Sequence, residues 1–85
     1  MRMTGIIELD LHGKNLYQAR IAIATTLRRA GTGVYRVRII HGFNGGTALR
    51  ELVRREFGTH PKVARVKPGT NAGITELVLR EWFDS

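Results

Sequence analysis

Two short peptides of this chain carry residues that could transfer protons. The first contains Asp10, His12 and Gly13, and the second begins with His41 and Gly42. Side chains two residues apart in a strand point to the same face, so the Asp10 carboxylate and the His12 imidazole could be neighbours. A carboxylate can fix the tautomer of an imidazole, as general acid–base catalysis requires. We therefore predict Asp10, His12 and His41 as catalytic residues, with His41 either a second proton-transfer group or a ligand for phosphate oxygens.

Structural roles would explain the same residues. Asp10 could cap the next turn by accepting hydrogen bonds from backbone N–H groups, and His12 could be an imidazole bonded to a carbonyl. The side chains of Asp10, His12 and His41 could in principle hold a divalent metal, but this ligand set is small. The sequence requires no cofactor.

Hydrophobic periodicity predicts the elements that position these residues. Asn15, followed three residues later by Gln18, is typical of a capping box that begins a helix. Strands are expected at about 6–11, 34–40, 62–67 and 74–80, and helices at about 15–30 and 48–57. The order is β-α-β-α-β-β. Because each strand alternates between apolar and charged residues, we expect both helices on one face of a four-stranded mixed sheet, an α+β two-layer sandwich.

The composition limits the classes of partner. The chain has 85 residues, with 14 Lys plus Arg against 7 Asp plus Glu, a formal net charge of +7 and no cysteine. Such a balance favours nucleic acid, acidic proteins or an anionic membrane surface. No apolar run is long enough to span a membrane, and no signal-peptide pattern opens the chain. We expect one domain over 1–85, a cytoplasmic location, nucleic acid as the partner and a monomer by default.

Both His–Gly peptides should lie at the same edge of the sheet. Parallel strands bring their carboxyl ends, and the N-termini of the following helices, to one rim, where N–H groups can hold phosphate. Phe43 in the second peptide either packs the loop onto the domain or stacks on a base. The predicted nucleic-acid contacts are Gly13, Lys14, Gly42, Phe43, Asn44, Gly45, Gly46, Thr47, Arg50 and Arg54.

With these motifs, nearly the whole chain resembles the small MutS-related (Smr) domain. The resemblance rests on Leu-Asp-Leu-His-Gly at 9–13, Ile-Ile-His-Gly at 39–42, Gly-Gly-Thr-Ala-Leu-Arg at 45–50 and His-Pro-x-Val at 60–63. It implies a fold like the C-terminal domain of translation initiation factor three, nucleic-acid binding and, in several relatives, nicking endonuclease activity. The family's functional positions match Asp10, His12, Gly13, His41, Gly42 and Gly45 or Gly46. The second motif is one residue longer here than the usual glycine–any–glycine.

The sequence thus leads to one main hypothesis and two alternatives. The main hypothesis is a nucleic-acid-binding protein of the Smr type that could nick DNA or RNA with its Asp and His residues. The first alternative is a non-catalytic module that binds RNA or a ribosome. The second, an enzyme for a small phosphorylated ligand, would need a closed pocket.

Overall fold

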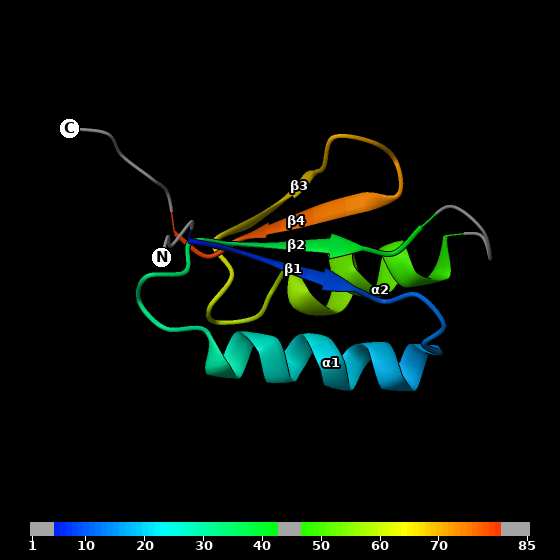
Figure 1. Ribbon diagram of the computed structural model, residues 1–85, viewed down its shortest axis with the longest axis horizontal. Helices are drawn as coiled ribbons and strands as arrows, with labels where there is room; N and C mark the ends of the chain where they lie inside the picture. The colour runs from blue at the N-terminus through cyan, green and yellow to red at the C-terminus, as the bar shows by residue number, and fades with distance from the viewer. Residues whose placement is uncertain (1–4, 43–46, 81–85) are drawn as a thin grey trace.

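The chain folds into a four-stranded sheet with two helices in the order β-α-β-α-β-β (Figure 1). The computed structural model describes residues 5–42 and 47–80. Strand β1 pairs parallel with β2, and β4 pairs antiparallel with both β2 and β3, which gives the sheet order β1-β2-β4-β3. The predicted mixed sheet is confirmed. The elements are β1 (Ile6–Asp10), α1 (Leu16–Arg29), β2 (Arg36–Ile40), α2 (Ala48–Phe57), β3 (Arg65–Pro68) and β4 (Ile74–Val78).

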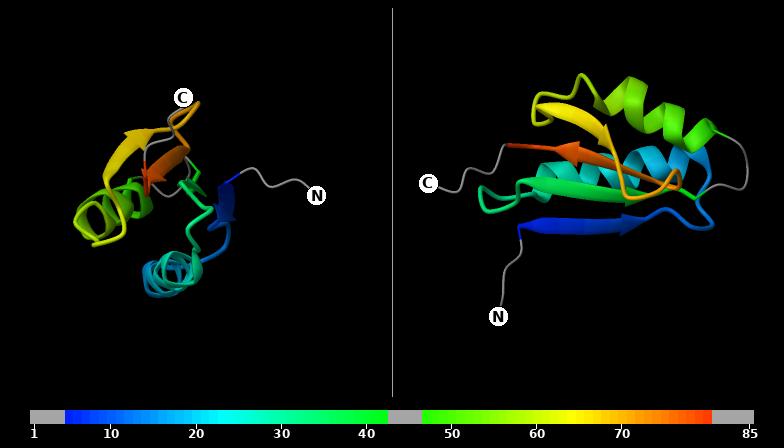
Figure 2. Two further views of the ribbon diagram at one scale, coloured as in Figure 1. Left: turned by 90° about the vertical axis from the view of Figure 1, so that its left-hand side faces the viewer. Right: turned by 90° about the horizontal axis from the view of Figure 1, so that it is seen from above.

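Both helices cover the same face of the sheet, as the alternating strands predict (Figures 1 and 2). Each element contributes its apolar side to the layer between sheet and helices, where burial removes hydrocarbon from water. Leu52, Val53 and Phe57 are buried, which gives α2 the apolar side that its hydrophobic periodicity predicts. The buried core is Leu11, Ala19, Ile23, Leu27, Val37, Ile39, Leu52, Val53, Phe57, Val63 and Leu77.

The predicted capping box begins α1. The Asn15 side chain accepts a hydrogen bond from the backbone N–H of Gln18 at 2.8 Å, and the Gln18 side chain accepts one from the backbone N–H of Asn15 at 3.0 Å. These two bonds satisfy donors that the first turn of a helix leaves free. The cap also fixes the direction in which the chain leaves the first His–Gly turn.

The third strand begins later than predicted, at Arg65 instead of residue 62. The segment before it forms a turn, in which the N–H of Val63 donates to the carbonyl of His60 at 2.9 Å. Pro61 has no N–H to donate to a sheet and favours such a turn. The ammonium of Lys62 instead donates to the carbonyls of Leu27 at 2.7 Å and Ala30 at 3.1 Å, at the end of α1.

The other face of the sheet is charged, but its central carboxylate is buried. The alternation predicts Glu76 as outward, and it does face away from the helices, yet only 4% of the residue is exposed. Arg38 donates to Glu76 at 3.1 Å and to Glu8 at 3.2 Å, and Arg36 lies 3.3 Å from Glu76. The hydrogen bonds to Glu76 and then Glu8 raise the pKa of Arg38. These ion pairs offset much of the positive charge of this face.

No helix within residues 5–42 and 47–80 is long and apolar enough to cross a membrane.

Candidate nucleic-acid interface

The two His–Gly turns lie side by side at one end of the sheet, called here the rim (Figure 1). Strands β1 and β2 pair in parallel register up to Asp10 and Ile40, and the N–H of Leu11 donates to the carbonyl of Ile40 at 2.9 Å. Antiparallel β4 begins at the same end, where Ile74 pairs with Ile40. The predicted convergence at the carboxyl ends of β1 and β2 is confirmed for the backbone.

The first turn is held by Asp10. Its Oδ1 accepts a hydrogen bond from the backbone N–H of His12 at 2.9 Å, so the carboxylate caps the turn. Gly13 follows with φ +78°, a conformation that side chains rarely adopt. This arrangement leaves the side chains of His12 and Lys14 exposed at the rim. Of the two roles open to Asp10, the structure shows the structural one.

The second turn is fixed by a buried imidazole. His41 is 8% exposed, with Nδ1 3.1 Å from the carbonyl oxygen of Gly42 and Nε2 2.8 Å from Oγ1 of Thr75. A carbonyl can only accept, so Nδ1 carries a proton, and the Thr75 hydroxyl forms the second hydrogen bond of the ring through Nε2. The backbone N–H groups of His41 and Gly42 both donate to the carbonyl of Gly73 at 2.9 Å.

Thr75 is therefore a site residue that sequence reasoning missed. The alternation of the last strand places it only on the inward side. It meets His41 because β2 and β4 pair in a register that sets Ile39 opposite Thr75. The only signal in the sequence was a polar residue among the apolar inward positions of that strand.

The two imidazoles do not form a pair. The His41 ring is bonded to β4, whereas His12 lies exposed at the end of β1, and the parts of the chain described here show no hydrogen bond between the rings. Within the same residues, no three His, Cys, Asp or Glu side chains gather as a metal-binding group. Asp10, His12 and His41 therefore do not assemble a shared ligand set. Their catalytic roles remain predictions.

Helix α2 begins next to this end of the sheet. Thr47 precedes the helix without capping it through its side chain, and its carbonyl accepts from the N–H of Glu51 at 2.8 Å. The predicted contacts Phe43, Asn44, Gly45 and Gly46 lie outside the described residues.

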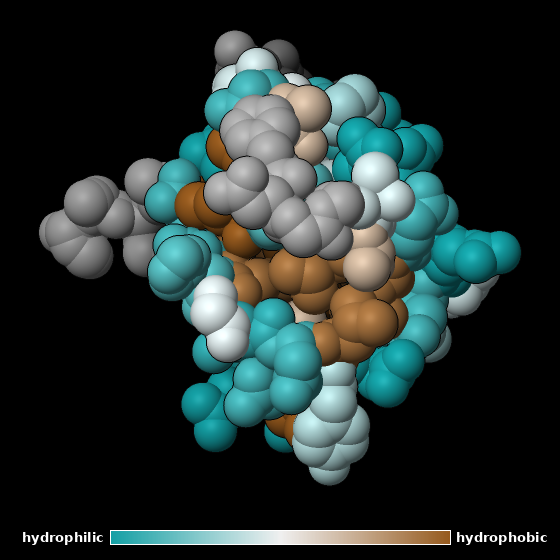
Figure 3. Space-filling view, turned by 90° about the vertical axis from the view of Figure 1, so that its right-hand side faces the viewer, coloured by the Kyte–Doolittle hydropathy of each residue, from teal (hydrophilic) through white to brown (hydrophobic). Residues whose placement is uncertain are grey.

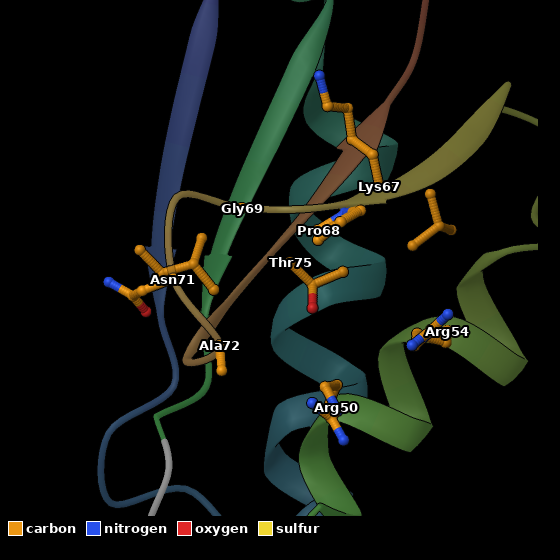
Figure 4. A pocket seen from close by; sticks show the side chains of 10 residues that line it. Arg50, Arg54, Lys67, Pro68, Gly69, Asn71, Ala72 and Thr75 are labelled. Atoms are coloured by element: carbon orange, nitrogen blue, oxygen red, sulfur yellow. The ribbon is translucent and has the colours of Figure 1, made fainter.

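Two arginines of α2 carry charge that no acidic group offsets among the residues described. Arg50 and Arg54 form no ion pair there, whereas Arg20 of α1 is bonded through two nitrogens to Glu56 at 2.8 Å. Arg50 and Arg54 line a cavity of about 360 Å³ between α2 and the hairpin that joins β3 to β4 (Figure 4). Both residues thus place positive charge at this end of the sheet, and their contact with nucleic acid stays a prediction.

The rim is not uniformly polar. Figure 3 shows this end of the molecule with an apolar area near its centre and hydrophilic residues around it. Apolar surface within a polar surround is suited to a partner that has both flat apolar groups and charge, as nucleotides have. The high net charge alone did not predict this apolar centre.

Comparison with known proteins places the chain in a family. The family model described as the Smr domain matches residues 9–79. The crystal structure of the Smr domain of Thermus thermophilus MutS2 is similar, with a TM-score of 0.79 and 26% sequence identity over 88% of this chain and 99% of that chain. No curated protein matches. The match over residues 9–79 shows that the chain belongs to the Smr domain family.

Proposed function

We propose that this protein binds nucleic acid at the rim. The supporting observation is that Arg50 and Arg54, which form no ion pair within residues 5–42 and 47–80, line a cavity at the end of the sheet where the strands turn and both helices begin. Arginine suits phosphate oxygens because its planar group donates two parallel hydrogen bonds. The membership of the chain in the Smr domain family supports the same function, because nucleic-acid binding is what that resemblance implies.

We further propose that His12 transfers a proton in the cleavage of a phosphodiester bond. Its imidazole is exposed at the rim, on a turn that Asp10 holds in place. His12 would take the proton of an attacking water or ribose hydroxyl as the new P–O bond forms. The P–O bond to the leaving sugar oxygen breaks and that oxygen takes a proton from water, while the charge of Arg50 offsets the negative charge that develops on the phosphate. His41 would act as a positioning residue, because both of its ring nitrogens are already bonded.

A nicking assay tests the cleavage proposal. The purified protein is incubated with supercoiled plasmid and, separately, with RNA, next to His12→Ala and a matched His60→Ala variant. His60 lies in the turn after α2, where its Nδ1 accepts from the N–H of Lys62 at 3.0 Å. We expect nicks from wild type and His60→Ala and none from His12→Ala, with binding retained in all three.

Each other outcome has a definite meaning. Nicks that persist at the wild-type rate in His12→Ala would contradict the role of His12. Binding without any cut product from wild type would favour the alternative of a non-catalytic RNA- or ribosome-binding module. The second alternative, an enzyme for a small phosphorylated ligand, would be supported if the protein turned over such a ligand but bound neither DNA nor RNA.

A further inference from the structure

The cavity between α2 and the β3–β4 hairpin lies next to the rim and has a wall on each side. Arg50 and Arg54 come from α2, and Pro68, Ala72 and Thr75 come from β3, the hairpin and β4 (Figure 4). In Figure 4 the side chain of Lys67 extends away from the two arginines, so these form the charged side of the opening. The hairpin residues form the opposite side.

The charged side has an unused donor. Residues four apart on a helix lie on the same face, about 5–6 Å from each other, so the Arg50 and Arg54 guanidinium groups can act together. Nε of Arg50 is buried and has no hydrogen-bond partner within residues 5–42 and 47–80. A buried donor without an acceptor destabilises the fold, and a shift of the Arg50 side chain that let a phosphate oxygen or a base acceptor reach this N–H would satisfy it. The flat face of arginine also stacks on bases.

The opposite side offers apolar contact and one fixed acceptor. Val66, Pro68, Ala72 and Ile74 supply hydrocarbon surface. The Thr75 hydroxyl is hydrogen-bonded to Nε2 of His41, and its oxygen keeps a lone pair that can accept from a group in the cavity. The volume of about 360 Å³ is near the lower end of the range of about 300–1,000 Å³ for small-molecule pockets. This space suits one nucleotide and excludes a duplex.

We propose that this cavity holds one unpaired nucleotide, with its base against the hairpin wall and its phosphate on Arg50 and Arg54. The proposal rests on nucleic-acid binding at the rim and adds the substrate class: a strand that is single-stranded where it enters the cavity. A duplex would contact the rim but leave the cavity empty. The protein should therefore bind a single strand more tightly than the same sequence in a duplex.

A variant that fills the cavity tests this. Ala72→Phe adds a ring at an exposed position of the hairpin that lines the cavity, and Ala64→Phe makes the same change at an exposed position outside it. Neither residue has a positive φ that the larger side chain would strain. Affinities are measured by fluorescence anisotropy with a labelled single-stranded oligonucleotide and with its duplex. Urea unfolding confirms that each variant folds, and Ala72→Leu serves as a milder second filler.

We expect wild type to prefer the single strand by about tenfold, and Ala72→Phe to lose that preference while keeping its affinity for the duplex. Ala64→Phe should match wild type on both probes. Equal wild-type affinities, or a single-strand preference that survives both fillers, would overturn the cavity proposal while leaving binding at the rim intact. A wild-type protein that binds neither probe would overturn both proposals.

Discussion

At the scale of single residues, one hydrogen bond connects the rim with the cavity. It joins the buried imidazole of His41, in the second His–Gly turn, to the hydroxyl of Thr75, which lines the cavity beside Arg50. Each of the two groups therefore depends on the other for its orientation. Sequence could point to His41, because it follows an apolar strand and precedes a glycine, but it could not find a partner that lies 34 residues away.

Replacing Thr75 with valine should show what this hydrogen bond contributes. Valine has a similar shape but no hydroxyl, so Nε2 of His41 would lose its partner in a buried place. We expect the free energy of unfolding to fall by about 1–3 kcal/mol in urea denaturation. Thr75→Ser retains the hydroxyl and should lose clearly less. A valine variant as stable as wild type would contradict a contribution of this hydrogen bond.

Asp10 shows why sequence alone left two roles open. The spacing of Asp10 and His12 puts them on one face only if the strand continues through residue 12. The strand ends at Asp10, and Gly13 turns the chain with a positive φ. The carboxylate therefore meets the backbone N–H of His12. Local spacing could indicate the turn but not the point at which the extended backbone stops.

At the scale of elements, hydrophobic periodicity predicted both helices and the capping box predicted the start of α1, whereas the start of β3 was predicted three residues too early. The interval 62–67 contains alternating residues, which favoured a strand. In the structure, residues 60–63 form a turn instead, and Lys62 contacts the end of α1. Such a contact depends on how α1 and this turn pack together, and no local pattern reveals it.

Lys62 should contribute to stability through the end of α1. Its ammonium donates to the carbonyls of Leu27, Arg28 and Ala30, three acceptors at the negative end of the helix dipole. We expect Lys62→Met to lower the free energy of unfolding by about 1 kcal/mol. Lys67→Met in β3, for which the structure gives no such contact, serves as the matched control. Equal losses in the two variants would contradict the capping role.

At the scale of the molecule, ion pairs offset the arginine charges on some parts of the surface and leave them without an acidic partner on another. Arg36 and Arg38 are paired on the open face of the sheet, and Arg20 is paired between the helices, whereas Arg50 and Arg54 remain unpaired among the described residues. Composition predicted a basic protein and a polyanionic partner. It could not predict where the charge is offset, because that depends on strand register and on the packing of α1 against α2.

The Arg20–Glu56 pair should make stability depend on pH. The hydrogen bond from Arg20 lowers the pKa of Glu56 below its ordinary value. Because the folded pKa lies below the unfolded one, the pair stabilises the fold above the unfolded pKa, about 4.3, and this contribution is lost as the pH falls through the folded value. The stability difference between wild type and Glu56→Gln should therefore shrink between pH 7 and pH 3 at low salt.

The Arg20→Gln background provides the control for this pair. There Glu56→Gln should no longer change the pH dependence, because the partner that lowers the pKa of Glu56 is absent. Urea denaturation of the four proteins at the two pH values gives the eight free energies of unfolding that the comparison needs. If the stability difference between wild type and Glu56→Gln stays constant or grows toward low pH, the lowered pKa of Glu56 is contradicted.

The most direct test of the account is the salt dependence of nucleic-acid binding. The double variant Arg50→Gln/Arg54→Gln is compared with wild type and with Arg28→Gln/Arg29→Gln, which removes equal charge from exposed positions at the far end of α1. We expect wild-type affinity to fall steeply with salt, and the slope of log affinity against log salt to shrink by about 1–2 only in the α2 variant. A wild-type affinity that ignores salt, or equal slopes in the two variants, would contradict binding at the rim.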